Sequence, residues 1–443
     1  MTHLIETFTS VFDQSAIKPK RLVVAFSGGV DSRVLLELAA HYAKTHGIDC
    51  QAIHVHHGLS DNADLWAEQC QAWCDDLSVP LVVERVSLDV HSGESIEKLA
   101  RDARYNAFKS HLRQGDVLVT GQHVDDQVET FLLALKRGSG PKGLSSMAKV
   151  MPFSGAYIVR PMLSVTRAEI EAFARRMGLT WVEDESNQDV RFDRNFIRHQ
   201  VTPVLTERWP SFRESVSRSA QLCAEQEMLL DELLASHLQQ ALGDDQSLSI
   251  EVLSEQSALL RARLLRMWLG HCQQAMPSQK QLQLIWEEVA CAQHDANPKL
   301  VLNDVEVRRF NQKLYLVREI KDLSGWQGDI AVGGKLLLPD GLGDVSLHAG
   351  VSESEPGRRV QTFSLPDQNA VLRVTFNPEG LSAHPVGRGH SRKLKKLFQE
   401  YQVPSWLRRR TPILMDGDRV IAVLGLFVDK NYDGQDCEAL WSN

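Results

Sequence analysis

The chain has 443 residues, 43% of them hydrophobic and 24% charged, and its 49 basic and 57 acidic side chains give a net charge of −8. This composition is typical of a soluble globular protein and excludes a disordered or collagen-like chain. At roughly 100–200 residues per domain, the length predicts two or three domains. No stretch approaches the ~18 apolar residues of a membrane helix, so we expect no membrane partner. Seven scattered cysteines and the lack of a signal-peptide pattern predict a reduced, cytoplasmic protein.

The first 200 residues alternate between strand-like and helix-like segments. Short apolar runs predict strands, and the longer periodic segments that follow them predict helices. Such an alternation predicts an α/β domain with a doubly wound parallel sheet, in which ligands bind beyond the carboxyl ends of the strands. Strands are expected at 21–26, 50–56, 81–86 and 116–121, and helices at 32–45, 63–77, 95–112 and 125–135.

The pattern changes near residue 216, which predicts further domains. The long helices of 216–271 are a candidate dimer face, although the sequence leaves the oligomeric state open. Glycine-rich turns at 325–334 and 341–350 indicate a linker into a small α+β domain. Further helices are expected at 216–241, 256–271 and 391–401, and strands at 299–307, 313–317, 371–376 and 420–427. The predicted domains are therefore an α/β domain (1–215), a mainly helical domain (216–340) and a small basic domain (360–443).

The strongest motif, SGGVDS, joins the first predicted strand to the first helix. Its glycines let the backbone approach a ligand closely, and the following helix directs free N–H groups towards the turn, which suits an anion. Ser27 and Ser32 add hydroxyl donors, and Asp31 could hold a Mg²⁺ ion beside phosphates. The alternative, a plain glycine turn before a helix cap, is disfavoured by the apolar strand that precedes it. The motif consists of Ser27, Gly28, Gly29, Val30, Asp31 and Ser32.

SGGVDS resembles the loop of the PP-loop ATP pyrophosphatases, enzymes that adenylate a carbonyl oxygen and release pyrophosphate. Six further segments follow it in the order HVHHGL, ARDARY, GQHVDDQVET, RPML, EDESN and RNFIR, starting at residues 54, 100, 121, 160, 183 and 194. Together with LKKLF at 394 and PSWLR at 404, this set is similar to the tRNA(Ile)-lysidine synthetase family over nearly the whole chain. Gln122 departs from the family pattern, which more often has His there.

The resemblance implies a ligase that uses ATP and Mg²⁺ and acts on free L-lysine and an isoleucine tRNA with a CAU anticodon. The ε-amine of lysine would be joined to C2 of the wobble cytidine through an adenylated tRNA, with AMP and pyrophosphate as products. The SGGVDS loop would hold the pyrophosphate, and His54 and His56 would line the ATP pocket. For these histidines the alternative is partial burial in the core, and their spacing fits no zinc site.

Asp126 and Glu129 are three residues apart on a predicted helix, so their carboxylates share one face. They could hold the lysine amine and accept its proton, since free lysine is almost fully protonated at pH 7. Arg194 or Arg198 could bind the lysine carboxylate in a bidentate manner. Alternatively, the acidic side chains complement the helix dipole, together with Asp125, and the arginines form surface ion pairs.

The segment 388–410 contains eight basic residues and only one acidic residue, Glu400, a local charge of +7 in an acidic protein. Such a cluster has two interpretations that the sequence does not separate. It is either a solvated helix face or a surface that contacts RNA phosphates. Tyr401 and Trp406 could stack on an unpaired base or belong to the core. The candidate tRNA contacts are Arg392, Lys393, Lys395, Lys396, Arg408 and Arg409.

Two other functions stay open. One is another PP-loop adenylating enzyme, such as a tRNA thiolase or an amide-forming synthetase. It is disfavoured because the sequence has no Cys-x-x-Cys pair and no recognisable glutaminase domain. The other is a non-catalytic RNA-binding protein, which the intact SGGVDS loop and the acidic pair of Asp126 and Glu129 disfavour.

Overall fold

The computed structural model describes residues 2–15, 17–89, 95–293, 296–318, 320–350, 359–365 and 370–442. It divides the chain into two compact units, Met1–Glu232 and Leu233–Asn443. Within the described ranges, no helix has the length and apolar character needed to cross a membrane.

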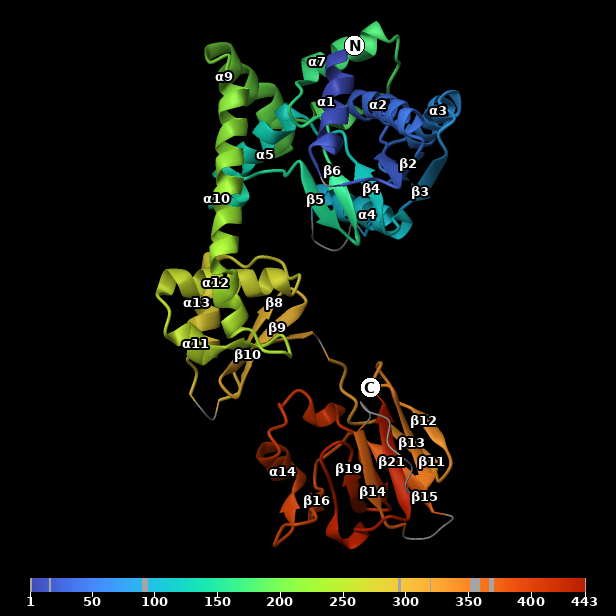
Figure 1. Cartoon of the computed structure of the whole chain (residues 1–443), viewed down its shortest axis with the longest axis vertical. Coiled ribbons are helices and arrows are strands. Elements are labelled where there is room, and N and C mark those ends of the chain that lie inside the picture. Colours follow the sequence, from blue (N-terminus) through green and yellow to red (C-terminus); the bar gives the residue numbers. More distant parts are fainter. Residues whose placement is uncertain are drawn as a thin grey trace. The chain divides into compact units, whose positions relative to one another are not determined.

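The first unit is built on a six-stranded sheet (Figure 1). Its strands are β1 (Arg21–Ala25), β2 (Asp49–His56), β3 (Leu81–Arg85), β4 (Asp116–Val119), β5 (Val150–Phe153) and β6 (Ala156–Val159). They lie in the order β3-β2-β1-β4-β6-β5, and all neighbours are parallel except β5 and β6. The predicted α/β class with a doubly wound parallel sheet is therefore confirmed.

Helices cover both faces of this sheet, because successive side chains of a buried strand point to opposite faces. Leu22 and Val24 pack in the cluster that includes side chains of α1, α2, α3 and α7, whereas Val23 packs with Phe108 of α4. The helices of this unit are α1 (Thr2–Asp13), α2 (Val30–His46), α3 (Ala63–Asp76), α4 (Ile96–His111), α5 (Val124–Lys136), α6 (Pro141–Leu144), α7 (Arg167–Arg176), η1 (Glu185–Gln188), α8 (Asp193–Phe196), η2 (Ile197–Val201) and α9 (Thr202–Arg208).

The winding of the sheet reverses at β1, since β2 and β3 lie on one side of this strand and β4 and β6 on the other. In open α/β sheets, ligands bind in the crevice beyond the carboxyl ends of the strands at such a point. The SGGVDS loop follows β1, and the loop after β4 leads through Gly121 into α5. The topology thus brings together two motifs that are far apart in the sequence.

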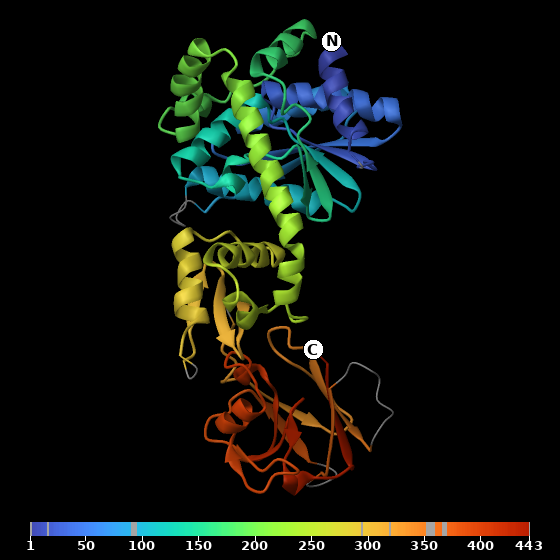
Figure 2. The ribbon, with the colours of Figure 1, turned by 60° about the vertical axis from the view of Figure 1, so that its left-hand side comes forward.

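The long helix α10 (Phe212–Ala241), shown in Figure 2, continues into the second unit. There, α11 (Ile250–Ser254), α12 (Ala258–His271), α13 (Gln279–Leu284) and η3 (Ile285–Ala290) share a core with the sheet β7-β10-β9-β8. The single strand expected at 299–307 is instead a hairpin, because Asn303 adopts a positive φ of 49° and turns the chain. The strands are β7 (Leu248–Ser249), β8 (Lys299–Leu302), β9 (Val305–Phe310) and β10 (Lys313–Arg318).

The C-terminal part of the second unit contains two large antiparallel sheets that share one apolar core, and a two-stranded sheet of β16 (Ser382–Ala383) and β17 (Arg392–Lys393). The first contains β11 (Gln327–Ala331), β15 (Val371–Thr375), β18 (Ile413–Asp416), β19 (Arg419–Val423) and β20 (Phe427–Val428). The second contains β12 (Lys335–Leu337), β13 (Asp344–Ala349), β21 (Cys437–Ser442) and β14 (Arg359–Phe363). The helix α14 (Leu394–Glu400) packs against side chains of β18 and β19.

The expectation of a glycine-rich linker before this domain is wrong. The segments 325–334 and 341–350 contain the whole of β11 and of β13, which pair with β15 and β21. Gly333 and Gly341 have positive φ values of 82° and 70° and lie in the turns between these strands. Tight glycine turns in an antiparallel domain and a flexible linker have the same composition, so the sequence did not distinguish them.

Candidate functional site

The SGGVDS loop is held in shape by the hydroxyl group of its own last residue. Ser32 Oγ accepts hydrogen bonds from the backbone N–H groups of Ser27 (3.2 Å) and Gly28 (3.0 Å) and donates one to the Gly29 carbonyl (2.9 Å). The N–H groups of Val30 and Asp31 lie in the first turn of α2, where a helix has no internal acceptor for them. They are therefore donors that this loop offers to a phosphate. The Ser27 hydroxyl lies 3.1 Å from Ser32 Oγ and would have to turn away from it to donate to a phosphate as well.

Gly28 is expected to tolerate no side chain. Its φ is +87°, and an added Cβ would lie 2.6 Å from Val182 Cγ2 and 2.9 Å from Cys70 Sγ. Replacing Gly28 by Ala should lower the free energy of unfolding by about 1–3 kcal/mol and abolish ATP binding. Gly47→Ala is the matched control, because Gly47 has a φ of +65° with nothing within 4 Å. Urea unfolding and calorimetric ATP titration of both variants check this. The expectation is contradicted if the two variants lose the same free energy of unfolding and Gly28→Ala binds ATP with normal affinity.

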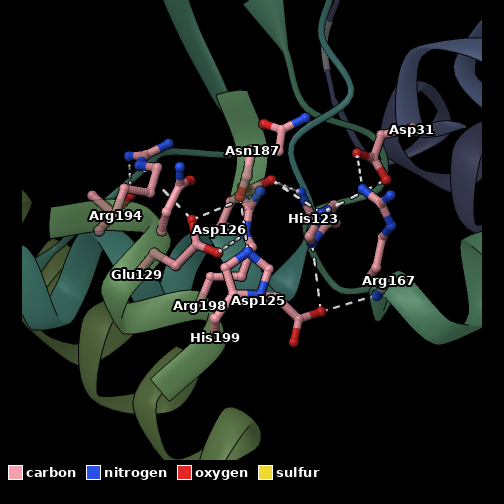
Figure 3. A network of polar contacts seen from close by, with 12 residues as sticks. Asp31, His123, Asp125, Asp126, Glu129, Arg167, Asn187, Arg194, Arg198 and His199 are labelled. Carbon is pink, nitrogen blue, oxygen red and sulfur yellow. Dashed lines mark hydrogen bonds and ion pairs between the residues drawn. The ribbon is translucent and has the colours of Figure 1, made fainter. Parts of the chain in front are cut away.

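His123 lies at the centre of the site, at the N-terminus of α5 (Figure 3). Its Nε2 atom is 3.6 Å from Asp31 Oδ1 and 3.4 Å from Asp126 Oδ2, and its Nδ1 atom is 3.5 Å from Asp125 Oδ2. Burial lowers the pKa of His123, but the three carboxylates raise it by more, so the pKa lies above its ordinary value. The ring thus links Asp31 of the SGGVDS loop to the start of α5.

Asp126 and Glu129 face two arginines that come from α8 and η2. Arg198 donates to the Glu129 carboxylate through Nε (2.6 Å) and Nη2 (3.0 Å) and to Asp126 Oδ1 through Nη2 (3.2 Å). Arg194 Nε is 3.8 Å from Glu129 Oε2, and Arg194 Nη2 donates to Thr130 Oγ1 at 3.3 Å. Burial raises the pKa of Glu129 although Arg198 and Arg194 oppose it. The structure therefore brings these four predicted residues into one cluster.

Asp31 completes this cluster on the side of the SGGVDS loop. Its Oδ2 atom accepts a hydrogen bond from Arg167 Nη1 at 2.7 Å, while its buried Oδ1 atom has no hydrogen-bond partner among the described residues. Burial raises the pKa of Asp31 above its ordinary value, although His123 and Arg167 act against it. The described residues contain no group of three His, Cys, Asp or Glu side chains placed to hold a metal.

The sequence did not indicate three contacts that shape this site. Asp125 accepts a hydrogen bond from the backbone N–H of Arg167 at 2.9 Å and forms an ion pair with Arg213 at the start of α10. Burial alone would raise the pKa of Asp125. The contacts with His123, Arg167 and Arg213 lower it by a larger amount, so the pKa lies below its ordinary range. Thr166 and Glu169 form a capping box that signals the start of α7. No local pattern in the sequence shows that Arg167 contacts Asp31 or that Arg213 contacts Asp125.

The histidines of HVHHGL lie at and after the end of β2. His54 is buried, and its Nδ1 atom contacts the Phe26 carbonyl at 3.0 Å, directly before the SGGVDS loop. His56 is also buried and lies 3.2 Å from Asp64. Both nitrogens of His57 are buried without a hydrogen-bond partner among the described residues, and burial lowers its pKa to about 4. ATP binding by His54 and His56 stays a prediction.

The basic segment 388–410 is partly neutralised by nearby acidic side chains. Arg388 and Arg392 both form ion pairs with Glu400. Arg409 pairs with Asp322 and Glu379, and Arg408 donates to the Val403 carbonyl. Tyr401 stacks on Phe427 and Trp406 packs on Phe310 and Tyr315, so both aromatic rings belong to the fold. Within this segment, three exposed basic side chains have no ion pair among the described residues: Lys393, Lys395 and Lys396.

Comparison with known proteins decides the family. Residues 1–205 match the model of the PP-loop domain, residues 248–315 that of the TilS substrate binding domain, and residues 372–443 that of the TilS substrate C-terminal domain. A tRNA(Ile)-lysidine synthase of Vibrio atlanticus is 78% identical over 455 aligned residues, which cover 100% of both chains. The chain belongs to the tRNA(Ile)-lysidine synthase family. Proteins of the same name from Vibrio vulnificus and Photobacterium profundum are 60% and 49% identical, over 100% and 95% of this chain and of theirs.

Among solved structures, a TilS C-terminal domain matches 26% of this chain and 94% of its own, at 26% identity and a TM-score of 0.20. The U34-tRNA thiolase NcsA of Methanococcus maripaludis matches 51% of this chain and 79% of its own, at 16% identity and a TM-score of 0.42. The chain is thus a ligase that uses ATP, and its PP-loop match lies within the first unit.

Proposed function

We propose that the chain uses ATP and Mg²⁺ to adenylate the wobble cytidine of the CAU-anticodon isoleucine tRNA and then joins L-lysine to C2 of that base. The observation that carries the proposal is the cluster beyond β1 and β4. It places the SGGVDS loop beside the buried carboxylates of Asp126 and Glu129, with His123 between them. Full-length similarity to proteins named tRNA(Ile)-lysidine synthase supports the same activity.

The first step makes the C2 oxygen of cytidine a good leaving group. That oxygen attacks the α-phosphate of ATP, so a P–O bond forms and pyrophosphate leaves. The N–H groups of Val30 and Asp31 and the Ser27 hydroxyl stabilise the charge on the departing pyrophosphate. Mg²⁺ is bound in proteins by one or two carboxylates together with phosphate oxygens and water, so the unpartnered Oδ1 of Asp31 fits it. Bound there, Mg²⁺ would neutralise phosphate charge.

The second step needs lysine as a neutral amine. Its ε-amine attacks C2, the bond from C2 to the adenylated oxygen breaks, and AMP leaves. Glu129 is suited to accept the amine proton, because burial raises its pKa above the ordinary value and makes it a stronger base. His123 is less suited to this role, because the three carboxylates around it raise its pKa and so favour its protonated form.

The contacts of Arg194 and Arg198 support a different role for each. Arg198 is occupied by both carboxylates and orients them. Arg194 Nε is buried without a hydrogen-bond partner among the described residues. We therefore assign the lysine carboxylate to Arg194, in the bidentate geometry that guanidinium groups favour.

Arg194→Gln is expected to raise the KM for lysine by roughly 10- to 100-fold, the equivalent of about one charged hydrogen bond. Pyrophosphate release from ATP and tRNA should stay near the wild-type rate. The decisive comparison uses cadaverine, which is lysine without its carboxylate. The wild-type chain should strongly prefer lysine, while Arg194→Gln should use both amines about equally. A variant that keeps its preference for lysine would contradict the assignment.

The function itself is tested by incubating the chain with ATP, labelled lysine and the tRNA, with a methionine tRNA as the control. Lysine should enter only the isoleucine tRNA, and sulfur incorporation instead would favour the thiolase alternative. That alternative has little chemical support here, since burial raises the pKa of Cys70 and Cys74 to about 12 and keeps both thiols protonated. A homodimer and a cytoplasmic location remain predictions from the sequence.

A further inference from the structure

The segment between Glu129 and Glu169 differs in charge from the rest of the first unit. Residues 1–215 have 24 basic and 28 acidic side chains, a net charge of −4. Between these two glutamates, however, the chain contains six basic residues and no Asp or Glu. Two of the six belong to the interior or the catalytic site: Arg160 is 4% exposed, and Arg167 contacts Asp31. The remaining four are Lys136, Arg137, Lys142 and Lys149.

These four side chains are exposed and lie within one short stretch, from the end of α5 through α6 to the turn before β5. Lys136 forms an ion pair with Asp193 at 2.6 Å. Arg137, Lys142 and Lys149 have no ion-pair partner in the part of the chain that the structure describes. We call these three residues the α6 basic surface. Its positive charge is uncompensated in a unit that is acidic overall.

The stretch is fixed directly to the catalytic helix. The buried side chain of Gln127 donates to the Met147 carbonyl (3.0 Å) and accepts from the Met147 N–H (2.8 Å). Gln127 lies between Asp126 and Glu129 on α5, so the helix that carries the acidic pair also carries this clamp. Two buried polar hydrogen bonds of this kind hold a loop in one conformation.

A second clamp holds the next two residues of the stretch. Arg160 Nη1 donates to the Ala148 carbonyl at 2.6 Å, and the backbone N–H of Arg160 donates to the Lys149 carbonyl at 2.8 Å. Lys149 is therefore exposed on a backbone that is fixed from two sides. At about 1.5 Å per residue, the C-terminal end of α5 lies only about 10 Å along the helix axis from Glu129.

The geometry points to the α6 basic surface as a contact for the phosphate backbone of the RNA next to the nucleotide being modified. This inference rests on the proposed function, because that function places an RNA nucleotide at Asp126 and Glu129. When the modified nucleotide lies at Asp126 and Glu129, the nucleotides next to it in the RNA strand must lie close to α5. The Lys and Arg side chains of the α6 basic surface, on a stretch that is hydrogen-bonded to α5, can neutralise such phosphates and release counterions. The partner is thus the anticodon stem and loop of the substrate, held through its backbone rather than its bases.

The test is a full-length variant with Arg137, Lys142 and Lys149 replaced by Gln. Its matched control replaces Lys18, Lys44 and Lys109, three exposed lysines of the same unit, so both variants lose the same charge. Binding to the CAU isoleucine tRNA and to its isolated anticodon stem–loop is measured from low to moderate salt. We expect affinity for both RNAs to fall roughly tenfold or more at low salt. The slope of log affinity against log salt should flatten by about 0.7–0.9 for each phosphate that is no longer neutralised.

Kinetics and a third variant separate this surface from other causes. The triple variant should show a raised KM for tRNA with an unchanged kcat at saturating tRNA. A variant with Lys393, Lys395 and Lys396 neutralised should lose affinity for the tRNA and keep its affinity for the stem–loop. If the wild-type chain modifies the tRNA while the α6 variant binds both RNAs like its control, the inference is wrong and the proposed function stands. A wild-type chain that neither binds nor modifies the tRNA would refute the proposed function instead.

Discussion

Glu129→Gln is expected to reduce lysine transfer by about 10²- to 10⁴-fold, the usual contribution of a general base. Gln has nearly the same shape as Glu, and Arg198 keeps its hydrogen bond to Asp126. The variant nevertheless cannot accept the amine proton. Pyrophosphate release from ATP and tRNA should continue, because the adenylation step does not use Glu129. Quenched time courses of the two products, measured on the same sample, check this separation of the half-reactions.

The control for this variant is Glu37→Gln, which removes a Glu–Arg ion pair of 2.8 Å with Arg33 on α2, away from the acidic pair. It should transfer lysine at the wild-type rate. The pH profile gives an independent check. Because a base must be deprotonated, lysine transfer by the wild-type chain should fall as the pH drops through the raised pKa of Glu129. A Glu129→Gln variant with equal losses of adenylation and transfer would mean that Glu129 only supports the fold.

Asp31→Asn should lower the rate of pyrophosphate formation by about 10²- to 10³-fold, the size expected when one preorganised electrostatic interaction is removed from the transition state. The change removes the negative charge that faces both Arg167 and the proposed Mg²⁺ position. Affinity for tRNA should stay within about twofold, since no RNA contact is assigned to this side chain. Measuring pyrophosphate release and tRNA binding of Asp31→Asn beside the wild-type chain tests both the expected loss of rate and the unchanged tRNA affinity.

Unfolding measurements distinguish a catalytic role of Asp31 from a structural one. Burial raises the pKa of Asp31, which means that the folded chain disfavours its charged form. A neutral Asn of similar size should therefore leave the free energy of unfolding nearly unchanged. Parallel losses of stability, tRNA binding and pyrophosphate formation would show that Asp31 holds the fold together.

Much of the first unit was predictable because its signals are local. The alternation of apolar runs and periodic segments predicted β1 to β4 and the helices that follow them to within a few residues. The three-residue spacing of Asp126 and Glu129 also placed both carboxylates on one face of α5, as the structure shows. Spacing along a helix is fixed by 3.6 residues per turn and requires no knowledge of the fold.

The parts that sequence reasoning missed depend on contacts between distant segments. Asp125 and Asp126 are close to His123 in the sequence, but nothing there shows that Asp31, from the SGGVDS loop, reaches the same ring. The basic tail was equally ambiguous. Its charge was visible, but the ion pairs of Arg392 and Arg409 are formed only by folding, which leaves three exposed lysines of the tail without an ion pair among the described residues. Roles in lysine, ATP and tRNA binding stay predictions for every residue of the site.

The most direct measurement follows the α-phosphate of labelled ATP in a reaction without lysine. The proposed mechanism places activation on the tRNA, so label should move to the isoleucine tRNA while pyrophosphate is released. Adding unlabelled lysine should then discharge the label as AMP and attach one lysine to each discharged tRNA. Label that appears on lysine, or on the tRNA only after lysine is added, would contradict the order of steps assigned to Asp31 and Glu129.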